Sequence, residues 1–208
     1  LLIWLFIAER LKPQLERISM KGKIWVIAAV IGVLGWLLLI GTLTVFRYLD
    51  LRTPCFDFGI FSQMFYYMRE TGLPLTTCER DGLLSHFAVH VSPSLYLLLP
   101  FYYVFPYPVT LLVLQVAIIA SGVIPLWKIG KRYGLKDGIC AGFSIVYLLF
   151  PAITGGCFYD FHENKLLLPL ILWMLYALEK NSGILFWILA VLVLGVKEDA
   201  AIYVACIG

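Results

Sequence analysis

Carboxylate and imidazole side chains occur at three separate places in a chain that is otherwise strongly apolar. The densest group is Asp160-Phe-His162-Glu163, which holds two carboxylates and an imidazole within four residues. Carboxylates beside apolar runs are costly to bury and are functional by default. A carboxylate can act as the general base of a group transfer, and Asp57 is our candidate for that role. The residues expected to be catalytic are Asp57, Asp160, Glu198 and Asp199.

The same Asp160–Glu163 segment could bind a divalent cation such as Mg²⁺ or Mn²⁺. Asp160 and Glu163 share a face if the segment is helical, whereas His162 points elsewhere unless the segment is a turn. We therefore expect at most two of the three to serve one ion. The alternative is structural, because acidic residues three apart form a capping box, and Asp57 could be a helix N-cap. Glu198-Asp199 could equally be a short solvated loop.

Further polar residues could bind a substrate. His86 and His90 are four residues apart, but a histidine pair without further ligands is more typical of hydrogen bonding than of a metal site. No phosphate-binding loop, dinucleotide motif or DNA-binding motif occurs, which disfavours nucleic acid or a soluble nucleotide as partner. The expected substrate-binding residues are Gln63, Arg80, His86, His90 and Lys197.

Composition indicates the class of protein. The chain has 208 residues, of which 62% are hydrophobic and 14% charged, against about 45–50% and about 25% in soluble domains. This excludes a disordered chain, a nucleic-acid-binding arm and an ordinary soluble enzyme. We expect an all-α, polytopic transmembrane helix bundle in the plasma membrane, in contact with membrane lipid.

Charge predicts the topology. Basic residues precede the uncharged run 24–46, so the N-terminal flank should be cytoplasmic and the loop 47–108 outside. The segment 95–105 is interrupted by prolines and too short to span, so it should lie along the outer face. This places the basic Lys128–Lys136 loop in the cytoplasm. The predicted spans are about 24–46, 109–127, 138–159, 164–179, 183–197 and a truncated 200–208.

This topology brings Asp57, the Asp160–Glu163 segment and Glu198 to the outer side, where we expect them to share one cavity. Phe58, Phe61, Phe65 and Met68 recur at helical spacing, which predicts a helix lying along the membrane surface and ending near Gly72. Together with the segment 95–105, this helix would form an apolar groove.

The ends and the cysteines give weaker indications. The chain begins at Leu1 rather than Met and stops within an apolar run, so we expect 1–208 to be a single transmembrane domain from the N-terminal part of a longer protein. The apolar Leu1–Ala8 could be an interfacial anchor or the end of an earlier helix. Cys55 and Cys78 share one loop and could pair if that loop is extracytoplasmic.

Several of these motifs occur in the order found in a known family. From about Arg47 onward, Phe56-Asp57-Phe-Gly59, the His86 to Pro93 segment, Gln115, Asp160-Phe-His162-Glu163 and Val196-Lys197-Glu198-Asp199 resemble a family of uncharacterised prokaryotic predicted membrane proteins. That family more distantly resembles the GT-C membrane glycosyltransferases, such as protein O-mannosyltransferases and aminoarabinose transferases. Asp57 and Asp160 fall where those enzymes have acidic residues in their first two outer loops.

The resemblance implies a GT-C-like enzyme that moves a sugar from a polyprenyl-phosphate donor to an extracytoplasmic acceptor. Arg80 or Lys197 would then neutralise the departing phosphate, and the apolar groove would take the prenyl chain. The Asp-x-Gly and His-Glu details differ from those of the mannosyltransferases. The resemblance therefore does not specify which sugar is donated or which molecule accepts it. The alternative is a transporter or lipid flippase that uses membrane carboxylates for ion coupling. A transporter should place carboxylates near the midplane and often shows repeated halves, and the sequence shows no repeat. A non-catalytic scaffold would leave the acidic motifs without a role.

Overall fold

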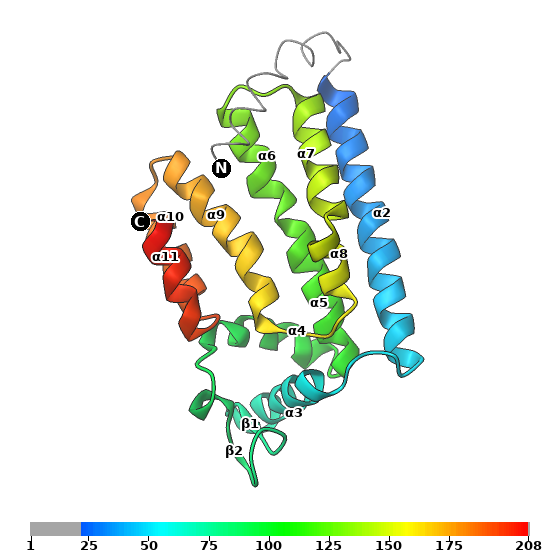
Figure 1. Cartoon of the computed structure of the whole chain (residues 1–208), viewed down its shortest axis with the longest axis vertical. Coiled ribbons are helices and arrows are strands. Elements are labelled where there is room, and N and C mark those ends of the chain that lie inside the picture. The colour runs from blue at the N-terminus through cyan, green and yellow to red at the C-terminus, as the bar shows by residue number, and fades with distance from the viewer. Residues whose placement is uncertain (1–21, 208) are drawn as a thin grey trace.

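The structure is a computed structural model that describes residues 22–207, and it is mostly helical (Figure 1). The helix α2 (Gly22–Leu49) and the nearly continuous pair α5 (Pro108–Ser121) and α6 (Val123–Arg132) are long and apolar enough to cross a membrane. They contain the predicted spans 24–46 and 109–127. The expected anchor Leu1–Ala8 and the basic N-terminal flank lie outside the described residues.

The predicted span 138–159 is not one straight helix. It consists of α7 (Asp137–Leu149) and α8 (Pro151–Cys157), which meet at 49°. Pro151 causes the break, because a proline lacks the N–H of a continuous helix and disfavours helical backbone at the preceding residue. Phe150 is accordingly extended, with φ −60° and ψ 125°.

The last helices are shorter than the sequence predicted. Where spans 164–179, 183–197 and 200–208 were expected, the helices are α9 (Leu167–Glu179), α10 (Gly183–Leu194) and α11 (Ala201–Ile207). Short 3₁₀ turns take up the remaining residues, η3 (Glu163–Leu166) before α9 and η4 (Glu198–Ala200) before α11. Both turns lie at the end of the bundle that α3 covers (Figure 1).

The segment between α2 and α5 forms a layer across this end of the bundle. It consists of α3 (Phe56–Thr71), a hairpin of β1 (Leu75–Thr76) and β2 (Leu84–Ser85), the turns η1 (His86–Ala88) and η2 (Pro93–Leu98), and α4 (Leu99–Val104). The hairpin is a small departure from the all-α expectation. The predicted helix after Cys55 is confirmed, and Gly72, with φ 76°, ends it in the left-handed conformation that glycine favours.

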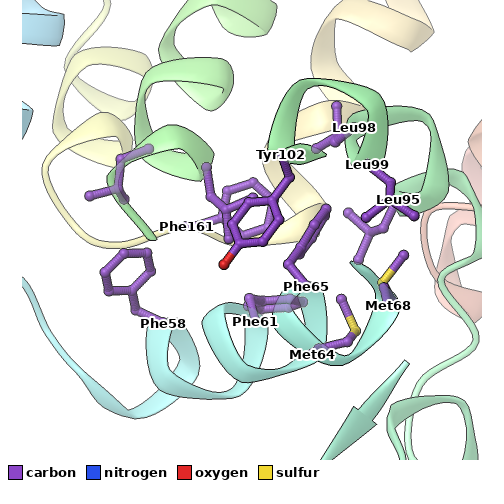
Figure 2. Packing of buried hydrophobic residues seen from close by; sticks show 12 residues of the cluster. Phe58, Phe61, Met64, Phe65, Met68, Leu95, Leu98, Leu99, Tyr102 and Phe161 are labelled. Atoms are coloured by element: carbon purple, nitrogen blue, oxygen red, sulfur yellow. The ribbon is translucent and has the colours of Figure 1, made fainter. Parts of the chain in front are cut away.

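The apolar face of α3 packs inside the protein rather than forming a groove. Phe65, Met64 and Met68 are fully buried, and Phe161 and Tyr102 pack against this face (Figure 2). The cluster also includes Leu95, Leu98 and Leu99 from the segment that was expected to form the other wall of the prenyl groove. That expectation is wrong for these faces, because two facing apolar surfaces exclude water by packing together.

Candidate functional site

A cavity of about 240 Å³ opens between α3, the hairpin region and the turns η3 and η4. The buried His86 and Glu163 lie in its wall, whereas Phe56 and Arg80 are exposed. The described residues that line it are Phe56, Asp57, Ile60, Phe61, Glu79, Arg80, His86, Val89, His90, His162, Glu163 and Lys197. Residues from four distant parts of the chain therefore meet in one small space.

Asp57 lies in the first turn of α3 and contributes its side chain to this cavity. The N-cap of α3 is Cys55, whose side chain makes no capping hydrogen bond, so Asp57 is not the cap that the sequence allowed. A carboxylate in the first turn of a helix is still favoured by the helix dipole. Asp57 is thus held at the cavity by the start of a helix whose other face is fixed in the core.

The hairpin brings Glu79 and Arg80 to the opposite wall. Gln63 holds the hairpin to α3, since its side-chain oxygen accepts the backbone N–H of Thr77 at 2.8 Å. Gln63 does not line the cavity, so its contacts give it a structural role rather than the expected substrate contact. Glu79 was not singled out from the sequence, although it accepts a hydrogen bond from Nδ1 of the buried His86 at 3.0 Å.

Gln115 fixes the Asp160–Glu163 segment from within the bundle. Its side-chain amide donates to the Asp160 carbonyl at 2.8 Å, and its oxygen accepts the His162 N–H at 2.9 Å. Phe161 between them is fully buried and packs edge-on against Phe61 with ring centroids 5.2 Å apart. Gln115 was noted only as part of a motif, and its polar side chain within an apolar helix was the available signal of this role.

The capping box expected at Asp160 and Glu163 does not form. The N-cap of η3 is His162, whose Nδ1 accepts the Asn164 N–H at 3.3 Å. Asp160 and Glu163 are instead both buried, with exposures of 1%. Their side chains are therefore held by contacts other than helix capping.

Each of these buried carboxylates faces a lysine. Nζ of Lys197 lies 3.2 Å from Oε1 of Glu163, and Nζ of Lys165 lies 3.7 Å from Oδ1 of Asp160. Burial raises the pKa of Asp160 to about 6, and the nearby Lys165 only partly offsets it. Asp160 lies behind the cavity wall rather than in it, yet the charge of Asp57 is close enough to raise its pKa further.

His162 lines the cavity as a neutral imidazole. Burial lowers its pKa, against the opposing effect of the adjacent Glu163 carboxylate. Its Nδ1 lies 3.1 Å from Oε2 of Glu163, but that nitrogen accepts the Asn164 N–H. Nδ1 therefore contacts both a carboxylate and a backbone N–H, and these two contacts fix the orientation of the ring.

His90 lines the cavity and pairs with Glu198, which lies outside the lining. Nδ1 of His90 lies 2.7 Å from Oε1 of Glu198, and the Val91 N–H donates to the other carboxylate oxygen at 3.3 Å. The hydrogen bond from His90 lowers the pKa of Glu198 to about 2. Neither Glu198 nor Asp199 lines the cavity, and Asp199 is exposed. The two histidines thus contact different glutamates and do not share a metal.

The geometry does not assemble a metal centre from the expected residues. Within residues 22–207, no three His, Cys, Asp or Glu side chains are grouped so that they could hold a metal ion. Lysine ammonium groups face Asp160 and Glu163 where a cation would otherwise balance them. Cys55 and Cys78 are free and exposed, so the disulfide that the sequence allowed is absent.

The arrangement is suited to proton transfer beside an anionic group. Asp57 can accept a proton, the His162 imidazole can form a hydrogen bond, and the cations Arg80 and Lys197 can stabilise developing negative charge. Phe56 and Phe61 supply apolar ring surface in the same cavity. Acid-base groups, cations and aromatic rings around one space are typical of ligand sites.

A family model described as "Predicted membrane protein (DUF2079)" matches residues 47–208. The match includes every residue of the cavity and begins near Arg47, where the motif order in the sequence begins. No curated protein and no solved structure matches the chain.

Proposed function

Because the chain belongs to the DUF2079 family of predicted membrane proteins, and because its acidic, basic and aromatic side chains share one cavity, we propose that it is a membrane glycosyltransferase. It moves a sugar from a polyprenyl-phosphate donor to an extracytoplasmic acceptor. The observation that carries the proposal is the meeting of Asp57, Arg80, His162 and Lys197 in one space. The distant GT-C resemblance of the sequence points to the same reaction.

In the proposed reaction, Asp57 accepts the proton of the acceptor hydroxyl. The hydroxyl oxygen forms a bond to the sugar C1 while the bond between C1 and the phosphate oxygen breaks. The electron pair of that bond leaves with polyprenyl phosphate, and Arg80 and Lys197 stabilise its negative charge. No net oxidation occurs, and no metal is needed to balance the step.

The size of the cavity suits the headgroup rather than the lipid tail. At about 240 Å³ it is smaller than the pockets of roughly 300–1,000 Å³ that hold drug-sized ligands. The apolar side chains that pack against α3 leave no room for a prenyl chain among them. In the proposed complex the prenyl chain therefore lies outside the protein core and outside the cavity. Of the donor, only the sugar and its phosphate then enter the cavity, where the acceptor hydroxyl also reaches Asp57.

The rival proposal, a transporter or lipid flippase, has less support. Ion-coupling carboxylates of transporters lie near the bilayer midplane, at discontinuous helices. Here the ionisable residues of the cavity come from one helix start, one hairpin region and two turns at the same end of the bundle. Such a location suits chemistry at a membrane surface better than passage through it.

A paired assay tests the proposal. Membranes containing the full chain receive polyprenyl-phosphate sugars labelled in the sugar, and the label is followed into extracytoplasmic acceptors. The same cells are assayed for uptake of labelled solutes. We expect label transfer that is lost in the Asp57→Asn variant and no uptake that depends on the protein. Uptake without transfer would replace the proposal by the transporter.

A further inference from the structure

A basic face lies on α6 at the end of the bundle opposite the cavity (Figure 1). Lys128, Lys131 and Arg132 are spaced by three and four residues, so they share one side of the helix, and all three are exposed. Ile124 lies one turn before Lys128 on the same side and is 49% exposed. Along this face α6 therefore changes from a surface suited to lipid tails to a surface suited to charged headgroups.

Two aromatic rings of α9 lie beside this face. The helices α6 and α9 pack against each other, and Nζ of Lys128 lies 4.6 Å from the ring centroid of Trp173 and 5.3 Å from that of Tyr176. Both rings are half-buried. Tryptophan and tyrosine are enriched at the depth of lipid headgroups, because their rings are apolar and carry one hydrogen-bonding group. The rings therefore place the Lys128 ammonium at the depth where lipid phosphates lie.

The acidic side chains at this end of the bundle already have partners. Asp137, at the start of α7, lies 2.7 Å from Nζ of Lys131. Glu179, at the end of α9, accepts a hydrogen bond from the Tyr133 hydroxyl at 2.7 Å. Within residues 22–207, the other two cations of the face form no ion pair. The face therefore keeps positive charge that an anionic ligand could neutralise.

The helix dipole of α6 does not account for the whole face. It favours basic residues in the last turn, which contains Lys131 and Arg132. Its effect falls off within that turn, and Lys128 lies before it. Lys128 stays exposed while it lies over the two rings of α9, so its ammonium can still contact a phosphate.

We propose that this face binds the headgroup of one anionic phospholipid in the leaflet at this end of the bundle. Lys128 and Arg132 donate hydrogen bonds to the phosphate, and the acyl chains lie along the apolar side of α6 that contains Ile124. An anionic headgroup such as phosphatidylglycerol neutralises both cations, whereas the ammonium of a zwitterionic headgroup meets like charge. The site is separate from the cavity and does not depend on the proposed sugar transfer.

Native mass spectrometry of the full chain in detergent tests the site with phosphatidylglycerol and with phosphatidylcholine of the same acyl chains. We expect one retained phosphatidylglycerol per protein, bound at least about tenfold more tightly than phosphatidylcholine, because each of two cations adds about fivefold. Phosphatidylglycerol should also raise the unfolding temperature, whereas glycerol phosphate, which has no acyl chains, should not. Equal binding of the two lipids, or equal stabilisation by glycerol phosphate, would overturn the lipid site.

Variants locate the site on α6. Lys128→Gln and Arg132→Gln should each weaken phosphatidylglycerol binding about fivefold, whereas Lys128→Arg, which keeps the charge, should bind like the wild type. Lys23→Gln is the matched control, because it removes one exposed positive charge from the same end of the bundle but on α2, which α7 separates from α6 (Figure 1). Unchanged binding in folded Lys128→Gln, or an equal loss in Lys23→Gln, would contradict a site on α6.

Discussion

The ammonium group of Lys197 lies 3.2 Å from Oε1 of Glu163, and this pair joins the turn before α9 to the turn before α11. The Glu163 side chain is 1% exposed and that of Lys197 is 15% exposed, so the pair is largely shielded from water. A shielded pair adds little net stability, but removing one partner leaves an uncompensated charge. The two turns are therefore coupled by charge as well as by packing.

The substitution Lys197→Met should destabilise the protein by about 3 kcal/mol, because it leaves the Glu163 carboxylate buried without its cation. Thermal unfolding of the purified protein in detergent measures the effect. The double variant Lys197→Met with Glu163→Gln should recover most of the loss. Lys180→Met, at an exposed turn, is the control and should change little. Equal losses in the single and double variants would mean that the pair is not coupled.

The substitution Asp57→Asn should reduce sugar transfer by about 10²–10⁴-fold, the usual contribution of a general base. The amide keeps the shape of the side chain but cannot accept the proton. Folding should be unaffected, because the side chain of Asp57 is not the cap of α3. Label transfer from the polyprenyl-phosphate donor measures activity, and thermal unfolding is the control. Full activity in this variant would assign the base to another carboxylate.

The substitution Gln115→Leu should destabilise the protein by about 2 kcal/mol, because it leaves the buried His162 N–H without an acceptor. The Asp160 carbonyl would still accept from Lys165 Nζ, which lies 2.6 Å away. Sugar transfer should also fall in protein that is still folded, because the turn that presents His162 loses its fixed position. Thermal unfolding measures the stability, and label transfer measures the activity. A matched change at the half-buried Leu114, Leu114→Ala, controls for altered packing of α5 and should affect stability alone.

Asp160 should make the stability depend on pH. Burial raises its folded pKa from the ordinary value to about 6, so the protonated carboxyl is the form that the fold favours. The stabilisation of the folded state by this neutral carboxyl is fully present below about pH 4, and it is lost as the pH rises through about 6. The difference in unfolding temperature between wild type and Asp160→Asn, measured from pH 4 to 8, isolates this group. A difference that does not vary with pH would contradict the raised pKa.

The natural cysteines can report the sidedness. Cys55 and Cys78 are exposed at the cavity end, whereas Cys140 and Cys157 are buried. If the cavity faces outward, a membrane-impermeant maleimide added to intact cells should label Cys55 and Cys78 in a Cys206→Ser background. An added Arg132→Cys, at the C-terminal end of α6 and at the other end of the bundle, should react only after the cells are opened. Labelling of Arg132→Cys from outside would reverse the topology.

Charge and helical periodicity predicted one of the elements that carry the site, the helix α3, but neither the hairpin nor the turns η3 and η4. The spacing of Phe58, Phe61, Phe65 and Met68 predicted α3, because a buried helical face must repeat every three or four residues. Alternation of the spans correctly brought the Asp57 loop and the Asp160–Glu163 segment to the same end. The sidedness of that end stays a prediction.

The sequence could not show which polar groups meet. Glu79 was missed because its role depends on the hairpin, which reverses the chain between α3 and His86. The capping box that the sequence allowed at Asp160 and Glu163 does not form, and both carboxylates face partly buried lysines instead. Apolar periodicity also cannot distinguish a face that contacts lipid from one that contacts protein, so the filled cluster under α3 was read as an open groove.

Ser94 docks the first loop onto the end of α10. Its backbone N–H donates to the Gly195 carbonyl at 2.8 Å and its hydroxyl to that of Leu192, also at 2.8 Å. A Cβ at position 195 would collide with the Ser94 hydroxyl, so the close approach requires glycine. A ribosome translates Ser94 about a hundred codons before Gly195. The first loop is therefore synthesised well before the surface on which it docks, and it can settle there only after α10 has formed.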